Sequence, residues 1–361
     1  MAIEFVGSLV NASLRSPPGA PGGPSSGLAT DPEYPARMAA LHEESGFDRL
    51  LVGHSSSAPD GFSVANQVLT TTSRLAVLLA HRPGFVAPTV AARQFATLEA
   101  FHPGRVAVHI ITGGDDADQL RDGDSCGKAA RYRRSDEFLQ VVKLTWASRE
   151  PFDYQGEFYR VAGGRSAVRP AGGSLPVYFA GASGDAVDVG GKHADVYAFW
   201  GEPLAAIAGR IAAVRAAASR YGRSPRFSVS LRPIAAATEE EAWDRAYRIL
   251  EVERARTGRG AVIDPRGSEG SLRLRRFADE AEIHDKRLWT PLAAVPTAAG
   301  NSTALVGSYE QVAEALLDYV AIGVSTLLIR GYDPETDATD YARIIKLVRD
   351  QEPALAGAAH P

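Results

Sequence analysis

Short apolar runs alternate along the chain with longer stretches in which apolar residues recur every three or four positions. The short runs predict strands, and the longer Ala- and Arg-rich stretches predict helices. The predicted strands cover residues 3–10, 49–52, 75–80, 106–111, 177–179, 196–199, 227–236 and 326–330. The predicted helices include residues 34–45, 88–101, 131–146, 203–221, 239–256 and 309–322. This alternation favours parallel strands wrapped by helices, and the strand count suits one closed α/β barrel, a (β/α)8 TIM barrel.

Two long irregular stretches interrupt this alternation. Residues 12–31 are rich in Gly, Pro and Ser and predict a long loop after the first strand. Residues 258–303 combine charged, helix-like pieces with an apolar end, and we expect them to form an inserted, mobile lid. Loops that follow the strands of a barrel form its active-site face. No shift in composition marks a linker, so we expect residues 1–361 to be a single domain.

Composition narrows the classes of partner and compartment. Hydrophobic residues make up 45% of the 361 residues, the net charge is −4, and no block of Lys and Arg favours nucleic acid or an anionic membrane. The single cysteine, Cys126, excludes an internal disulfide framework and a cysteine-rich metal site, and it fits a reducing cytoplasm. The amino-terminal residues lack the pattern of a signal peptide, and no run approaches 18 apolar residues. We therefore expect a cytoplasmic protein with no nucleic-acid or membrane partner.

Common catalytic motifs are missing from the sequence or lie in the wrong context. Gly-x-Ser-x-Gly occurs at 23–27 and at 123–127, but both matches lie in polar or Gly-, Pro- and Ser-rich stretches and not directly after an apolar strand, which argues against a serine hydrolase of the α/β-hydrolase type. No His-x-x-x-His or Cys-x-x-Cys spacing suggests a metal site. No Gly-x-Gly-x-x-Gly follows the first strand, so a dinucleotide site of the Rossmann type is not expected.

The most informative segment is residues 178–185, YFAGASGD, where an apolar strand runs into small residues and then a helix. Gly181, Ala182 and Ser183 would let the backbone approach a phosphate, with N–H groups of the helix start and one hydroxyl as donors. The same residues also suit an ordinary turn in which the serine caps the helix. Spacing alone leaves both interpretations open.

An ordered set of motifs extends this observation over most of the chain. The segments are RPG at 82–84, PTVAARQ at 88–94, ATL at 96–98, GR at 104–105, ITGGD at 111–115, RY at 131–132, EF at 137–138, the 178–185 segment, WGEP at 200–203, EEAW at 240–243, TALVG at 303–307 and GY at 331–332. In this order the chain resembles the bacterial luciferase-like superfamily. It looks most similar to the two-component alkanesulfonate monooxygenases that depend on reduced FMN.

The resemblance implies a barrel with inserted segments and a defined chemistry. It implies FMN that a separate NAD(P)H-dependent reductase delivers in reduced form. It also implies attack on O2 to give a flavin peroxide, which oxidises the substrate. Members of the family commonly form dimers or tetramers, so we expect a homodimer or homotetramer.

Three further residues are candidates for the cofactor side of the site. Tyr132 stands where the family has a tyrosine that reaches the flavin phosphate, although a tyrosine on one helix face can also simply pack. Thr112 follows a strand and could reach ring or ribityl oxygens, or it could cap a turn. His81 ends a strand and could lie at the ring edge, but a lone histidine is more often structural.

Three other residues are candidates for the reaction side. Trp200 matches a position that lines the substrate pocket, where an apolar wall helps to exclude water, although a tryptophan at the barrel rim can also pack against the core. Tyr332 matches a position facing the substrate, where a phenol can donate a proton or a hydrogen bond. His54, just past a strand, could be a proton donor or hydrogen-bond partner, or a solvated loop residue.

Departures from the family pattern concern the substrate. Where the sulfonate enzymes carry Arg-Leu-His, this chain has Ser230-Leu231-Arg232, so their arginine is a serine and their histidine an arginine. Residues 295–302 lack the arginine of their mobile loop, and Ser57 or Ala58 fills the position of a reactive cysteine. Arg232 and Arg330 could together bind an anionic headgroup, or Arg232 could be a structural ion-pair partner.

These features lead to one main hypothesis and two alternatives. The main hypothesis is a reduced-FMN-dependent monooxygenase that oxidises an organosulfonate or related organosulfur compound, with C–S cleavage to sulfite and an aldehyde. The first alternative is a hydride-transferring oxidoreductase of the same superfamily that uses the deazaflavin coenzyme. The second is a flavin-binding relative without catalysis.

Overall fold

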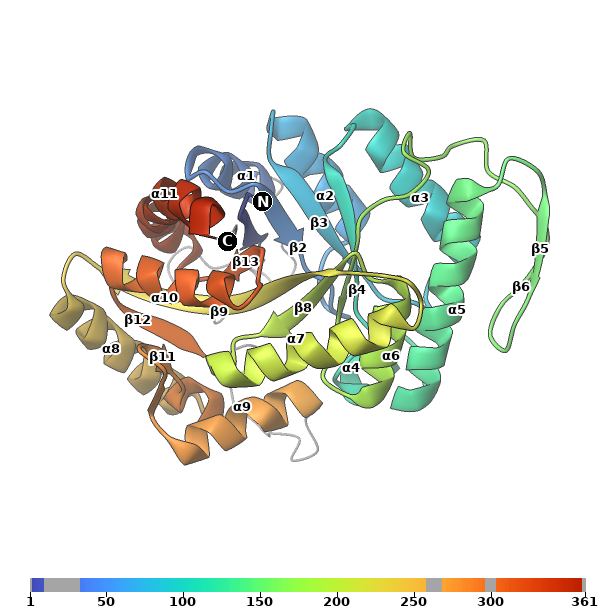
Figure 1. The fold of residues 1–361 in the computed structure, drawn as a ribbon. Helices are drawn as coiled ribbons and strands as arrows, with labels where there is room; N and C mark the ends of the chain where they lie inside the picture. Colours follow the sequence, from blue (N-terminus) through green and yellow to red (C-terminus); the bar gives the residue numbers. More distant parts are fainter. Residues whose placement is uncertain (1, 10–32, 258–267, 296–302, 359–361) are drawn as a thin grey trace. The chain divides into compact units, whose positions relative to one another are not determined.

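The computed structural model describes residues 2–9, 33–257, 268–295 and 303–358 (Figure 1). Its fold is the α/β class predicted from the sequence, a (β/α)8 TIM barrel of parallel strands with surrounding helices. The barrel strands are β1 (Glu4–Leu9), β2 (Arg49–Val52), β3 (Ala76–His81), β4 (Val106–Ile110), β7 (Val177–Ala180), β8 (Val196–Trp200), β9 (Arg226–Ala236) and β13 (Thr326–Ile329). Each of them overlaps a predicted strand.

The chain divides into two compact units. The first unit consists of residues 1–7, 44–47 and 180–361, and the second consists of residues 8–43 and 48–179. Each unit contains its own parallel strands, its own helices and its own set of candidate site residues.

The second unit is built on the parallel strands β2, β3, β4 and β7, in that order. All six residues of β3 are buried, as expected for a strand that reads as one apolar run. Asp60 caps the helix that precedes β3 by accepting the N–H of Ser63 at 2.8 Å, and Pro88 begins the helix that follows it. The helices are most of α1 (Tyr34–Glu44), α2 (Gly61–Thr71), α3 (Pro88–Phe101), α4 (Asp116–Arg121) and α5 (Lys128–Ala147).

A two-stranded hairpin follows α5 in this unit and lies beside that helix, where the Glu137 carboxylate accepts hydrogen bonds from the N–H groups of the hairpin turn (Figure 1). Its strands, β5 (Phe152–Gln155) and β6 (Arg160–Gly164), pair antiparallel. The alternation of strand and helix did not predict it, because a short polar hairpin belongs to no βα unit.

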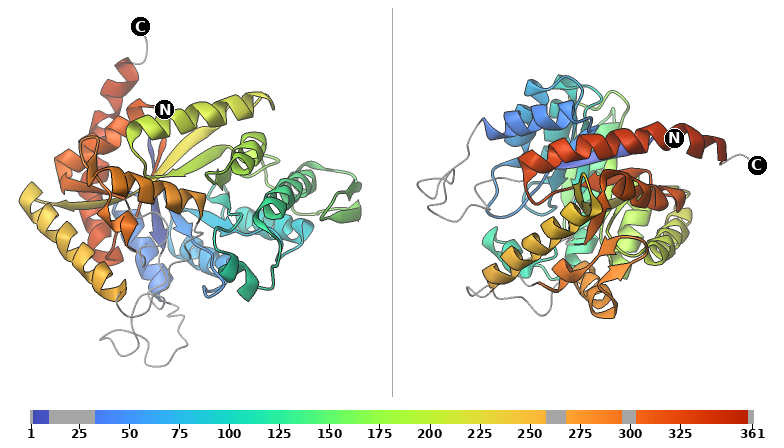
Figure 2. Two further views of the ribbon diagram at one scale, coloured as in Figure 1. Left: turned by 90° about the horizontal axis from the view of Figure 1, so that it is seen from below. Right: turned by 90° about the vertical axis from the view of Figure 1, so that its left-hand side faces the viewer.

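The first unit is centred on β9, which is long enough to pair with three neighbours. It pairs with β8 through residues 226–230, with β13 through 228–231, and with an additional parallel strand, β12 (Ala304–Ser308), through 232–236. The helices are α6 (Gly184–His193), α7 (Leu204–Ser219), α8 (Glu239–Thr257), α9 (Glu269–Glu280), α10 (Tyr309–Ala321) and α11 (Pro334–Ala358). Ser308 and Gln311 form a capping box at the start of α10, and α10 and α11 lie side by side (Figure 2).

The described part of the expected lid, residues 268–295, is folded. It contains α9, β10 (Ile283–His284), β11 (Leu288–Trp289) and the 3-10 helix η2 (Pro291–Ala294). β11 pairs antiparallel with β12, and Trp289 is fully buried. Residues 258–267 and 296–302, and the loop predicted at 12–31, lie outside the described residues, so the mobility of this segment stays a prediction.

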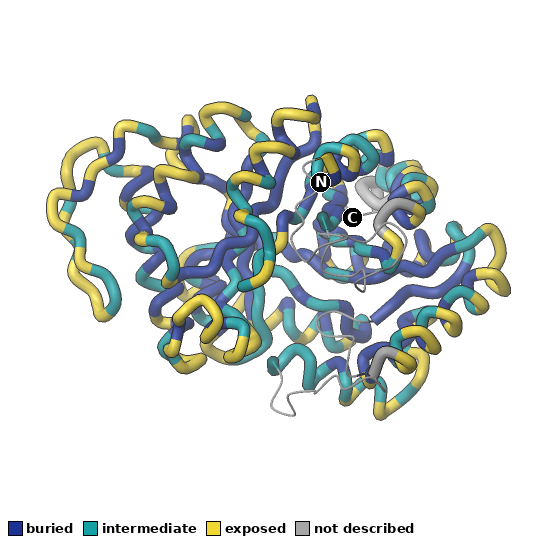
Figure 3. The backbone as a smooth tube through the Cα atoms, turned by 180° about the vertical axis from the view of Figure 1, so that it is seen from behind, coloured by how far each residue is buried: buried dark blue, intermediate teal, exposed yellow. Residues whose placement is uncertain are grey.

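Burial follows the predicted pattern within each unit (Figure 3). The strands are buried, whereas the outer turns of the helices and the β5–β6 hairpin are largely exposed.

Candidate active site

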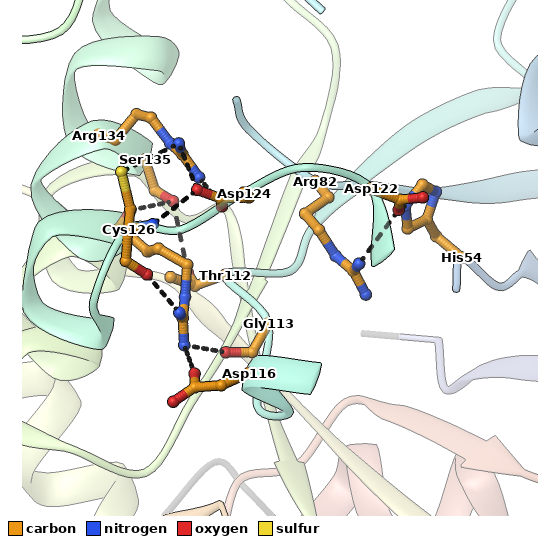
Figure 4. Close-up of polar contacts among 11 residues, drawn as sticks. His54, Arg82, Thr112, Gly113, Asp116, Asp122, Asp124, Cys126, Arg134 and Ser135 are labelled. Atoms are coloured by element: carbon orange, nitrogen blue, oxygen red, sulfur yellow. Dashed lines mark hydrogen bonds and ion pairs between the residues drawn. The ribbon is translucent and has the colours of Figure 1, made fainter. Parts of the chain in front are cut away.

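In the second unit His54 lies in the loop after β2, beside a buried arginine network (Figure 4). Its Nε2 is 4.0 Å from Oδ2 of Asp122, and its ring stacks on Phe85 with centroids 6.4 Å apart. Partial burial and the nearby Arg82 guanidinium lower the pKa of His54 below its usual range, while Asp122 opposes the shift. His54 is therefore neutral at pH 7, which suits a hydrogen-bond or proton acceptor better than a cationic donor.

Arg82, which follows β3, is held by carboxylates from the segment after β4. It is 5% exposed, its Nη2 donates to Asp118 Oδ2 at 2.6 Å, and its Nη1 lies 3.7 Å from Asp122 Oδ2. Asp118 also accepts a hydrogen bond from the Ser56 hydroxyl at 2.5 Å. Burial opposes the change, but these hydrogen bonds hold the pKa of Asp118 below its ordinary value. The Arg82 charge is thus neutralised inside the unit.

His81, at the end of β3, lies in an aromatic cluster. Its ring is 5.2 Å from that of Phe138 and 5.3 Å from that of Phe95, measured between centroids. Burial lowers the pKa of His81 to about 3, and its Nε2 has no hydrogen-bond partner within the described residues. The structure places His81 as a neutral, stacked side chain, and its contact with a cofactor stays a prediction.

The structure brings Thr112 and the first half of α5 together. Oγ1 of Thr112 is 3.4 Å from Oγ of Ser135, and both residues are buried. Tyr132, one turn earlier on α5, is also buried, with its ring 6.5 Å from that of Phe179. The two candidates predicted from separate motifs therefore share one region of the second unit.

The arginines beside Tyr132 are engaged in ion pairs, which the sequence interpretation missed. Arg131 donates to Asp116 at 2.7 Å and to the Cys126 carbonyl at 2.6 Å. Arg133 pairs with Glu157 at 2.8 Å. The charge of each arginine is therefore paired with a carboxylate.

In the first unit the small-residue turn after β7 is held firmly from one side. The Gly181 carbonyl accepts hydrogen bonds from the Tyr197 hydroxyl at 3.0 Å and from Arg210 Nη2 at 2.7 Å. Ser183 caps α6 by accepting the N–H of Ala186 at 3.3 Å, so the capping interpretation of this serine is confirmed. A methyl group built on Gly184 would meet no atom within 4 Å, so the helix start is open.

Trp200 and Glu202, at the end of β8, are packed by helices that follow in the chain. A methyl group built on Gly270 would lie 2.7 Å from the Trp200 ring, so the start of α9 contacts this tryptophan closely. Glu202 is fully buried and accepts hydrogen bonds from Arg210 at 2.8 Å and from Arg273 at 2.9 and 2.5 Å. Glu202 is therefore an ion-pair centre.

Sequence interpretation missed Arg210, although a signal for it exists. The buried positions of α7 include Ile207, Ile211 and Val214, so Arg210 shares the apolar face of an otherwise Ala-rich helix. An arginine on such a face needs a buried partner, and Glu202 is that partner.

Arg232 and Tyr332 also come together. The Cζ atom of Arg232 lies 5.2 Å from the centroid of the Tyr332 ring. Arg232 is 3% exposed, and among the described residues no carboxylate pairs with it and its Nε has no acceptor. The Tyr332 hydroxyl is buried without a partner at ordinary hydrogen-bond geometry among the described residues. Burial raises its pKa, Arg232 and Arg330 oppose the rise, and the Glu253 carboxylate adds to it. A buried cation with no ion-pair partner among the described residues is suited to bind an anion.

Two further kinds of feature are absent from the part of the chain that the structure describes. They contain no cluster of His, Cys, Asp or Glu side chains suited to a metal ion. None of their helices is both long and apolar enough to cross a membrane.

Comparison with known families and structures places the chain. The family model for luciferase-like monooxygenases matches residues 10–326. An EDTA monooxygenase (EmoA) from Chelativorans sp. BNC1 is similar, with a TM-score of 0.76, 17% identity, and coverage of 98% of this chain and 94% of that one. The oxygenating constituent of 3,6-diketocamphane monooxygenase from Pseudomonas putida, in complex with FMN, gives a TM-score of 0.68 at 17% identity, covering 97% and 99%. An F420-dependent secondary alcohol dehydrogenase gives 0.69 at 16% identity, covering 97% and 100%. At these identities the structural likeness concerns the fold alone.

Proposed function

Because the chain belongs to the luciferase-like monooxygenase family, we propose that it is a reduced-FMN-dependent monooxygenase of a two-component system. Its substrate in this proposal is an organosulfonate or related organosulfur anion. One atom of O2 ends in an aldehyde and the other in water, reduced FMN supplies two electrons, and cleavage of the C–S bond releases sulfite.

The observation that carries the substrate assignment is the buried charge of Arg232, with which no carboxylate among the described residues forms an ion pair. A guanidinium cannot lose its proton to escape burial, and an anionic ligand would balance its charge. The planar fork can donate two parallel hydrogen bonds to a sulfonate or carboxylate. Tyr332, stacked on Arg232, holds a buried hydroxyl that is free to donate to the same headgroup.

The residues of the first unit fit the phosphate of a flavin mononucleotide. The turn of Gly181, Ala182 and Ser183 has small side chains, an open helix start and a serine hydroxyl whose own hydrogen remains available. When bound, FMN would supply the redox chemistry. We assign these three residues, together with His81, Thr112 and Tyr132 of the second unit, to cofactor binding.

The remaining assignments concern the reacting groups. Trp200 forms an apolar wall that excludes water from the substrate. Neutral His54 accepts a proton or a hydrogen bond, and Tyr332 donates one. We also propose a single-domain homodimer or homotetramer in the cytoplasm, an NAD(P)H-dependent FMN reductase as partner, and closure of residues 258–303 over the substrate.

Release of sulfite from a panel of primary alkanesulfonates tests the proposal. An NAD(P)H-dependent reductase supplies reduced FMN, and reactions without the reductase and without O2 are the controls. Sulfite and aldehyde in equal amounts, only in the complete mixture, are expected. No sulfite from any member of the panel would exclude an organosulfonate substrate.

The second candidate is hydride transfer with the deazaflavin coenzyme. An F420-dependent dehydrogenase is among the similar structures, and this candidate predicts turnover without O2. A flavin-binding relative without catalysis is the third candidate, and it predicts tight FMN binding with no product from any substrate.

A further inference from the structure

We propose that Arg210 is a positioning residue for the flavin phosphate, acting through the peptide bond between Gly181 and Ala182. The inference rests on the proposed FMN-dependent function, and it concerns a residue that no motif of the sequence singled out. Arg210 would fix the orientation of this peptide and place positive charge behind it.

Two side chains fix the orientation of the Gly181 carbonyl. Arg210 and Tyr197 both donate to this oxygen, at 2.7 and 3.0 Å. In a trans peptide the C=O and the following N–H point in opposite directions, and no cis bond occurs within the described residues. The N–H of Ala182 is therefore directed away from the two donors. Fixing the carbonyl thus presents this N–H as a donor at the turn.

The ion pairs around Glu202 contain more arginines than carboxylates. This fully buried carboxylate is shared by the guanidinium groups of Arg210 and Arg273, so two positive charges face one negative charge. These three side chains carry one net positive charge, which Glu269 offsets in part at Arg273, and Arg210 is the member that touches the turn. Burial lowers the pKa of Arg210, but an arginine stays protonated at neutral pH. An anion at the turn would balance this excess.

The placement of Arg210 on the buried face of α7 needs a functional or structural reason. Its guanidinium lies against the Phe199 ring, 4.6 Å from the centroid, which compensates for only part of the lost hydration. Glu202 would still be paired with Arg273 if Arg210 were removed. The fold therefore does not require Arg210 for neutralisation, and its contact with Gly181 is its distinctive feature.

Comparison of FMN with riboflavin, which lacks the phosphate, isolates this role. Dissociation constants for both flavins, oxidised and chemically reduced, are measured by fluorescence or calorimetry for the wild type, Arg210→Met and Tyr197→Phe. Arg215→Met is the matched control, because Arg215 is on the same helix and stacks on Phe227 at 5.2 Å but does not contact the turn. Thermal unfolding checks that each variant is folded.

The wild type should bind FMN more tightly than riboflavin. Arg210→Met should weaken FMN binding about 10- to 100-fold, as expected for a charge-assisted contact, and riboflavin binding less than about threefold. Tyr197→Phe keeps the charge and loses one donor, so FMN binding should weaken about fivefold. Arg215→Met should leave both constants unchanged, and the ³¹P signal of bound FMN should shift in Arg210→Met alone.

Two other outcomes are distinguishable. If the wild type prefers FMN and Arg210→Met keeps the same ratio of FMN to riboflavin affinity, the positioning role is wrong while the proposed function stands. If the wild type binds neither flavin, or both equally, the phosphate turn itself is wrong, and this inference and the assignment of FMN to that turn fall together.

Discussion

Buried arginines occur in both units, and they differ in how their charge is balanced. In the second unit Arg82, Arg131 and Arg134 pair with Asp118, Asp116 and Asp124 respectively. In the first unit Arg232 is equally buried, yet it stacks on Tyr332 and no carboxylate among the described residues pairs with it.

This difference separates charges that build the fold from a charge that is available to a ligand. A buried ion pair is costly to break, because the remaining charge has lost its hydration and its partner. A buried charge that was never paired contributes that cost already in the folded state. The structure tolerates this cost at Arg232, and the proposed binding of an anion would explain why.

Removing one partner of a buried ion pair should have the largest effect on stability. Asp124→Asn leaves the Arg134 guanidinium buried without its carboxylate, and the free energy of unfolding should fall by about 3 kcal/mol. Asp188→Asn breaks the exposed pair with Arg220 and should cost less than about 1 kcal/mol. Urea unfolding of the two variants measures the contrast, and equal losses would mean that burial does not govern these pairs.

Removing the unpaired charge should affect catalysis and spare stability. Arg232→Met should lower kcat/KM for an anionic substrate about 100-fold, because a buried anion then lacks its counter-ion. Its free energy of unfolding should stay the same or rise, since an apolar side chain replaces an uncompensated charge. Steady-state kinetics and urea unfolding are needed together. A strongly destabilised Arg232→Met protein would show that this arginine is structural.

Buried histidines avoid the cost of a buried charge in a third way, because they can lose their proton and become neutral. The pKa of His81 falls to about 3 in the fold, from 6.5 in a free side chain. Below pH 6.5 the unfolded chain binds a proton that the folded chain does not, so stability falls as the pH drops from 6.5 toward 3. His42 and His109, whose pKa burial lowers to about 4, act in the same direction.

His81→Phe keeps an aromatic ring in the cluster and removes the titrating group. The slope of unfolding free energy against pH between 4.5 and 6.5 should become shallower by up to about 1.4 kcal/mol per pH unit. Urea unfolding at several pH values measures it. An unchanged slope would place the His81 pKa near its ordinary value and would weaken the view that buried groups here are paired or neutral.

The smallest expected effect concerns the exposed carboxylate at the start of α6. Asp185 lies in the first turn of that helix and opposes an anion bound there. Asp185→Asn should tighten FMN binding about two- to fivefold, and riboflavin binding should not change. Titrations with both flavins at low salt reveal the difference. Weaker FMN binding in this variant would argue against a phosphate at the helix start.

Much of the fold could be predicted from the sequence because βα alternation and continuous apolar strands report burial directly. The strands, the helix after Ser183 and the helical character of part of 258–303 are confirmed. The β5–β6 hairpin and β12 were not predicted, since short strands outside the alternation carry no periodic signal.

The site was less predictable, because it depends on contacts between residues that are distant in the sequence. The motifs placed Thr112 and Tyr132 near each other, and Arg232 near Tyr332, only through the resemblance. The pairing of Arg131 with Asp116, and of Glu202 with Arg210 and Arg273, depends on tertiary distances that no spacing encodes. An arginine in a sequence gives no indication of whether its charge is already balanced.

The requirement for O2 tests most directly whether the protein is a monooxygenase. The protein is mixed anaerobically with one equivalent of chemically reduced FMN and the organosulfonate that the panel favours, and O2 is then admitted. A monooxygenase should give no product before O2 is admitted and close to one sulfite per flavin afterwards. Turnover in the absence of O2, with reduced FMN or with the reduced deazaflavin coenzyme, would contradict this function.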